Sequence, residues 1–168
     1  MNADSMVTDK AADLPYLDAI AHALLDGALP DEIEGFGEED AKEAALFVAA
    51  CARQRPPGIA LVRLESVGGQ VGQRRMRLCV VMPFLVDSVA GAIAAKGLIV
   101  HRLLHPVVCV ERDDKGCLTS VGPLCDETEK RESIMYLEID RTDARGRQRL
   151  VSDLHRVLAD VRASVCDW

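Results

Sequence analysis

Apolar residues recur with a helical period in three parts of the chain. In the first part, residues 14–29, Leu17, Ile20 and Leu24 follow one another at intervals of three or four positions. That spacing puts them on one side of an amphipathic helix. The pattern predicts helices over residues 14–29, 84–96 and 143–166, and a further helix is predicted over 38–53 from its alanines and from acidic residues at its start and arginines at its end.

Other parts of the chain have the two-residue period of strands. In residues 133–140, Ile134 and Tyr136 alternate with Met135 and Leu137, so the two pairs face opposite sides of a sheet. Branched aliphatic residues and flanking turn residues mark further segments in the same way. Strands are predicted over residues 59–66, 75–82, 98–104, 107–112, 117–121 and 133–140.

The order of these elements predicts an α+β fold. From residue 75 onward the elements follow the order β-α-β-β, as in a split β-α-β, ferredoxin-like sandwich. Two N-terminal helices precede this part. We expect a mixed, mostly antiparallel sheet with helices on one face, in which 75–82 and 98–104 are parallel neighbours joined by a right-handed crossover. The expected domains are a disordered tail over 1–13, a helical segment over 14–56 and the α+β domain over 57–168.

Composition and charge narrow the class of protein. The chain has 168 residues, 20 Lys and Arg against 27 Asp and Glu, a net charge of −7 and 49% hydrophobic residues. This profile is typical of a globular domain, and the acidic balance argues against a nucleic-acid binder. No apolar run is long enough for a membrane span, and the polar N-terminus does not resemble a signal peptide. We therefore expect a cytoplasmic protein without membrane or nucleic-acid partners.

The sequence shows none of the common catalytic signatures, such as GxGxxG, GxxxxGK[ST], HExxH or GxSxG. Its six cysteines form no CxxC pair, and three disulfides would need a secreted context that the sequence does not indicate. Cys79 and Cys109 lie in apolar runs and are interpreted as small buried apolar residues. His101 and His105 are four positions apart in a predicted strand, which puts both on one face. A metal pair would need a third ligand that the pattern does not supply, so we interpret them as interface or ligand-facing residues.

Two pairs of polar residues are candidates for chemistry. Asp87 and Ser88 stand in the first turns of the helix predicted over 84–96, and a helix N-terminus suits a bound carboxylate. The alternative is that Asp87 balances the helix dipole and Ser88 packs against a neighbour. Glu138 and Asp140 could act as an acid–base pair, or they could form a solvated sheet face, or they could pair with Arg141 or Arg145.

Three motifs resemble a known family. They are MPFLVDSV at 82–89, KGLIVHRLLHPVVCVERDDKG at 96–116 and ESIMYLEIDR at 132–141. In this order they resemble the amino-terminal region of the large bacterial NAD-specific glutamate dehydrogenases. The upstream segment ARQRPPG and the closing helix fit the same region, so the resemblance covers roughly residues 45–168.

The resemblance implies an ACT-like regulatory domain that lies upstream of the dehydrogenase core. The catalytic residues and the NAD site of the parent would lie outside this chain, which is then an excised piece holding no catalytic, cofactor-binding or metal-binding residue. Its partners would be other domains or subunits of the dehydrogenase, and an amino-acid effector. The candidate effector or interface residues are Pro83, Phe84, Asp87, Ser88, His101 and His105.

Two other functions are kept as alternatives. One is a stand-alone ACT-like module that senses an amino acid, and the other is a small cysteine or metal enzyme. The chain departs from the resembled family at Cys79, Val80 and Val81, where the family usually has an Asn-Asp-Asp run. This departure, and the lack of a glycine in the turn that follows, weigh against a bound amino acid.

Overall fold

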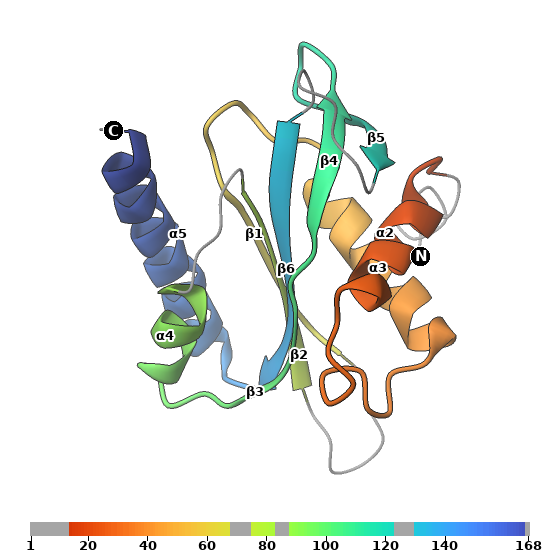
Figure 1. The fold of residues 1–168 in the computed structure, drawn as a ribbon. Helices are drawn as coiled ribbons and strands as arrows, with labels where there is room; N and C mark the ends of the chain where they lie inside the picture. The colour runs from red at the N-terminus through yellow and green to blue at the C-terminus, as the bar shows by residue number, and fades with distance from the viewer. Residues whose placement is uncertain (1–13, 68–74, 83–87, 123–129, 167–168) are drawn as a thin grey trace, which may run out of the picture.

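The described residues form a six-stranded open sheet between two layers of helices (Figure 1). The computed structural model describes residues 14–67, 75–82, 88–122 and 130–166. The helices are α2 (Leu17–Asp26), α3 (Glu38–Ala52), α4 (Ser88–Ala94) and α5 (Ala144–Cys166). The strands are β1 (Leu61–Ser66), β2 (Arg75–Met82), β3 (Val100–Leu104), β4 (Val107–Arg112), β5 (Leu118–Gly122) and β6 (Lys130–Asp140).

These elements coincide with those that the residue pattern predicts, apart from shifts at their ends. The predicted tail over 1–13 lies outside the described residues, as do residues 84–87 of the third predicted helix. The α+β, ACT-like fold class is confirmed by the four helices and the antiparallel sheet.

The strand order is β1-β2-β6-β4-β5, and β3 pairs with β6 beside β4. Every pairing among the described strands is antiparallel. The prediction that 75–82 and 98–104 are neighbours is wrong, because β6 lies between them and Leu137 pairs with both Leu78 and Leu103. The two strands still run in the same direction, since each is antiparallel to β6.

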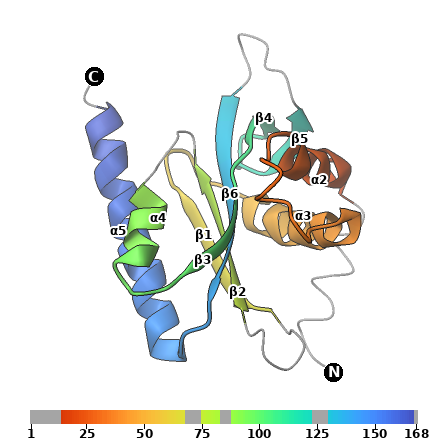
Figure 2. The ribbon, with the colours of Figure 1, turned by 60° about the horizontal axis from the view of Figure 1, so that its bottom comes forward.

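Helices cover both faces of the sheet (Figure 2). On one face Leu78 and Leu137 pack in an apolar cluster with Leu154 of α5. On the other face Val81 and Tyr136 belong to a second cluster with residues of α2 and α3. A strand that is buried on both faces has apolar side chains along its whole length. This explains the unbroken run of apolar residues at the end of β2.

Small residues let α3 pack closely in the core. Ala44, Ala45 and Ala49 of α3 are fully buried, and short side chains at these positions allow neighbouring elements to approach the helix backbone. The helix begins with a cap in which Asp40 Oδ2 accepts the N–H of Gly37 at 2.8 Å. Its first turn also has Glu38 and Glu39, which suit the helix dipole.

Candidate functional site

The N-terminus of the helix predicted over residues 84–96, which the sequence suggests as a carboxylate site, lies largely outside the described residues. Pro83, Phe84 and Asp87 lie outside the described residues. Ser88 is the first residue of α4, and its side chain is exposed. A carboxylate site at this turn therefore stays a prediction.

His101 is held at the end of the sheet by an acidic partner. Its Nε2 lies 2.7 Å from Oδ1 of Asp140, and Oδ2 of Asp140 accepts the N–H of Ile99 at 3.0 Å. The hydrogen bond with His101, followed by that with Ile99, lowers the pKa of the Asp140 carboxyl. The register of β3 against β6 shifts between Val100 and Arg102, so His101 sits in a bulge.

His105 binds a different part of β6. Its Nε2 lies 2.5 Å from Oγ of Ser133, a residue that is almost fully buried. Ser133 and Asp140 are seven positions apart on one strand, a separation of about 23 Å, and they face opposite sides of the sheet. The prediction that both histidines share a face is therefore wrong, because the bulge at His101 breaks the alternation.

The described residues bring no three His, Cys, Asp or Glu side chains together in an arrangement that could hold a metal ion. The thiols of Cys51 and Cys79 are free and buried, and burial raises the pKa of Cys79. Cys109 is disulfide-bonded, which the interpretation of the cysteines as small apolar residues did not anticipate. Buried thiols of raised pKa are poor nucleophiles.

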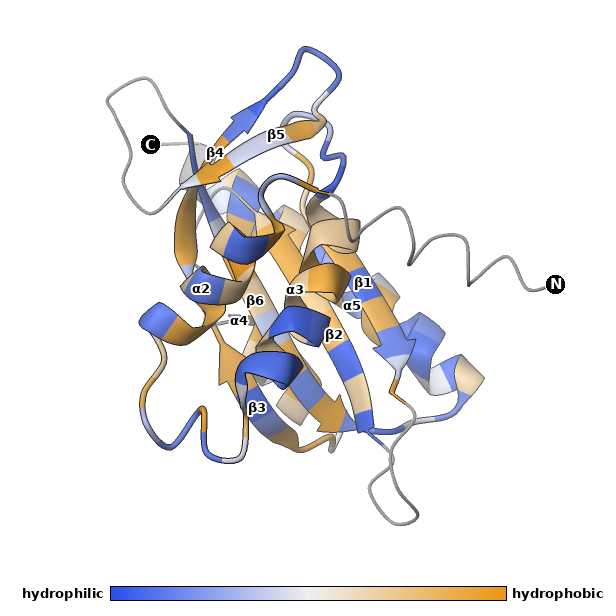
Figure 3. Ribbon diagram, turned by 90° about the vertical axis from the view of Figure 1, so that its right-hand side faces the viewer, coloured by the Kyte–Doolittle hydropathy of each residue, from blue (hydrophilic) through white to orange (hydrophobic). Residues whose placement is uncertain are grey.

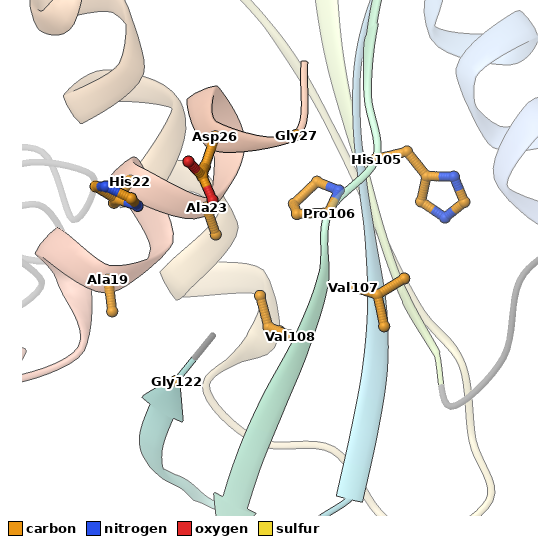
Figure 4. A pocket seen from close by; sticks show the side chains of 10 residues that line it. All are labelled: Ala19, His22, Ala23, Asp26, Gly27, His105, Pro106, Val107, Val108 and Gly122. Carbon is orange, nitrogen blue, oxygen red and sulfur yellow. The ribbon is translucent and has the colours of Figure 1, made fainter. Parts of the chain in front are cut away.

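A hollow of about 400 Å³ lies between α2 and the start of β4 (Figure 4). Its walls are mostly small or apolar residues, including Ala23, Pro106 and Val108. The ring of His105 lies on the side of β4 away from α2. His22 and Asp26 are thus the polar side chains that α2 brings to the hollow, and they do not converge with His105 on one point.

Three charged side chains form a buried cluster where α3, β4 and β6 meet. Glu132 is 1% exposed and lies between two arginines. Its Oε1 accepts Nε–H of Arg55 at 2.9 Å and Nε–H of Arg112 at 2.8 Å, and its Oε2 accepts from Arg112 at 2.7 Å. Arg112 also donates to the carbonyls of Ala52 and Gly116, each at 2.9 Å. These carbonyl dipoles stabilise the positive charge of Arg112, the second arginine beside Glu132.

The arginines keep Glu132 ionised. Burial alone would raise the pKa of its carboxyl, but the hydrogen bonds and charges of Arg112 and Arg55 outweigh burial and lower it. All three side chains are at most 8% exposed. A cluster that is buried and internally satisfied joins three segments of the chain and has no free group for a substrate.

A second polar cluster surrounds Glu138. Arg75 donates to its Oε2 at 3.0 Å, Arg102 Nε lies 3.4 Å from its Oε1, and the hydroxyl of Tyr136 lies 3.4 Å from Oε1. Burial, followed by the charge of Glu138, raises the pKa of Tyr136. The expectation that Glu138 and Asp140 pair with Arg141 or Arg145 is wrong, since the partners come from β2 and β3.

Comparison with known proteins identifies the family. A family model described as "Glutamate dehydrogenase, ACT1 domain" matches residues 20–154. The chain belongs to this ACT1 domain family. An NAD-specific glutamate dehydrogenase of Pseudomonas aeruginosa is 39% identical over 90 residues, and one of Halomonas elongata is 37% identical over 90 residues. Each match covers 52% of this chain and 6% of the relative's length. No solved structure matches the chain.

Two of the three motifs and the upstream segment ARQRPPG bind one another in space. Arg55 of ARQRPPG and Arg112 of the HPVVCVERD segment both bind Glu132 of ESIMYLEIDR. His105 and Ser133 join the same two later motifs a second time. In this ACT1 domain the motif residues are structural contacts, and sequence reasoning missed them because their partners are up to 77 positions away.

Proposed function

We propose that this chain is a noncatalytic regulatory and assembly domain of a large NAD-dependent glutamate dehydrogenase. The observation that supports this most directly is the ACT1 match over residues 20–154, combined with a coverage of only 6% of each curated relative. The reaction of the parent would be the oxidative deamination of L-glutamate to 2-oxoglutarate and ammonia. NAD and the catalytic residues would be bound by other parts of that enzyme.

The described side chains support a structural role. The buried cluster around Glu132 and the partly buried cluster around Glu138 consist of ion pairs between neighbouring segments. No described helix is long and apolar enough to cross a membrane. The domain would act through its surface, by contacting other domains or subunits, and an amino-acid effector would modulate those contacts. The cytoplasmic location and the identity of such an effector stay predictions.

The test uses the full-length enzyme from which the chain comes. The isolated chain should oxidise no glutamate, while deletion of residues 14–166 should change the number of subunits in the assembly or its response to amino acids. The measurements are NAD reduction with glutamate and light-scattering mass. Asp160→Ser, on the exposed side of α5, is the matched control. Glutamate oxidation by the isolated chain, or a deletion that changes neither readout, would contradict the proposal.

A further inference from the structure

The outer edge of β1 has no partner strand among the described residues. β1 pairs with β2, while α3 and α5 contact it from the two sides of the sheet, and Figure 3 shows it at one margin of the sheet. An unpaired strand edge is a template for another strand. We propose that β1 pairs with β1 of a second copy of this chain, antiparallel about a two-fold axis at Leu64. The proposed dimer goes beyond the dehydrogenase function and does not depend on it.

The backbone allows this pairing. The N–H of Val67 donates to the carbonyl of Arg75 at 3.1 Å, in continuation of the β1–β2 ladder. Bonding alternates along an antiparallel ladder, so the odd-numbered residues of β1 bond to β2. Val62, Leu64 and Ser66 therefore direct their N–H and C=O groups outward. With the axis at Leu64, Leu64 bonds to the partner's Leu64, and Val62 bonds to the partner's Ser66.

The charges on β1 select this register. Arg63 and Glu65 flank Leu64 on one face of the strand, with side chains 37% and 31% exposed. With the axis at Leu64, Arg63 of each copy lies opposite the partner's Glu65, which gives two cross-strand pairs of opposite charge. Moving the axis by one residue puts Arg63 opposite Arg63 or Glu65 opposite Glu65, and like charges opposite each other are unfavourable.

The other face of the edge offers apolar surface. Two hollows lie along the seam between β1 and α5, one of about 360 Å³ beside Leu64 and Val151, and one of about 260 Å³ beside Ala60 and Leu158. Ile59, at the same seam, is 49% exposed. Burial of this surface would stabilise a dimer. The strand contact spans only about 17 Å, so we expect reversible association that depends on concentration.

The test measures the mass of the 168-residue chain by sedimentation over a wide concentration range. The unchanged chain should shift from monomer to dimer as its concentration rises. Arg63→Glu and Glu65→Arg should each weaken dimerisation about tenfold, because each places two pairs of like charge across the axis. An equimolar mixture of the two variants should recover the dimer, since the substituted positions of the two copies then face each other with opposite charge.

A chain that stays monomeric at every concentration would overturn the proposal. So would single variants that dimerise as the unchanged chain does, or a mixture that does not recover. Because Glu65 also pairs with Arg77 within the copy, a second measurement avoids both charges. Leu64→Cys should crosslink to itself on mild oxidation, while Val62→Cys should not, with the unchanged chain as a control for the native cysteines. Equal crosslinking of the two variants would contradict the register.

Discussion

Glu132 shows how one residue joins distant parts of the chain. Its carboxylate accepts hydrogen bonds from Arg55, 77 positions away, and from Arg112, 20 positions away. The arginines also bind backbone carbonyls, so the donors and the acceptor of the cluster are satisfied together. A buried ion pair contributes little against an apolar replacement of all its members, but removal of one member is costly.

We expect Glu132→Gln to lower the free energy of unfolding by about 3–5 kcal/mol, because two buried arginines lose their counter-charge. Urea denaturation measures this loss. Glu111→Gln, on the exposed side of β4, is the control and should change stability little. A Glu132→Gln loss as small as that of the control would show that the cluster is not a stabilising contact.

The same carboxylate gives a pH dependence with a defined sign. The pKa of Glu132 is lowered in the folded state, so its contribution is complete above the unfolded value of about 4.3 and is lost as pH falls through the folded value. The stability difference between the unchanged chain and Glu132→Gln should therefore be constant near neutral pH and shrink in acid. Denaturation at several pH values measures it, and a difference that grows in acid would contradict the sign.

Gly116 is required by a close backbone approach. Its φ is +77°, and a Cβ atom at this position would collide with the carbonyl of Arg55. Gly116→Ala should destabilise the protein by at least about 1 kcal/mol. Gly91→Ala is the matched control, since Gly91 lies in α4 with open space around it, and alanine there should stabilise by about 0.5–1 kcal/mol. Thermal denaturation gives the melting temperature of each variant. Equal shifts in melting temperature for Gly116→Ala and Gly91→Ala would refute the steric argument.

At the scale of elements, α3 has several short side chains on its buried side. Its buried alanines belong to the apolar cluster that α2, α3 and one face of the sheet share. The alanines from which the sequence predicts a helix over 38–53 have the highest helix propensity, and their short side chains leave little room for larger ones.

Ala45→Leu tests this packing. The substitution adds three carbon atoms to a fully buried position, and overpacking a core costs about 1–3 kcal/mol. Glu39→Leu adds an apolar side chain to the exposed side of the same helix and should cost little. Urea denaturation compares the two variants. A neutral effect of Ala45→Leu would mean that the elements packed around α3 can move apart to accept the larger side chain.

At the scale of the whole molecule, β6 is the central element. It pairs with β2 along one side and with β3 and β4 along the other, and residues on both of its faces are buried. The two apolar clusters therefore depend on one strand. Among the described strands β5 pairs only with β4, and it exposes Thr119 and Ser120.

This arrangement predicts an order of hydrogen exchange. Amides of residues 134–139 in β6 should exchange slowest, near the rate of global unfolding, because they are paired and buried on both faces. Amides of β5 should exchange several orders of magnitude faster through local opening. Native-state exchange monitored by NMR measures both groups. Equal protection of β5 and β6 would mean that the domain opens only as one unit.

The sequence predicted the elements well because their periodicity is local. Ile134 and Tyr136 face one apolar cluster, and Met135 and Leu137 face the other, as their alternation indicates. The motif resemblance also led to the ACT1 family that the family model confirms. The structure does not bring the two candidate histidines together, since His101 and His105 bind separate partners. Pro83, Phe84 and Asp87 fall outside the described residues.

The amino-acid sequence by itself determined which segments are helices and strands, and which face of each is apolar, because these depend on neighbours within a few positions. Only the tertiary structure decided that β6 separates β2 from β3, that a bulge at His101 turns the two histidines apart, and that Glu132 lies between Arg55 and Arg112. Those outcomes depend on pairing between residues far apart in the chain, and local periodicity contains no information about the choice of partner.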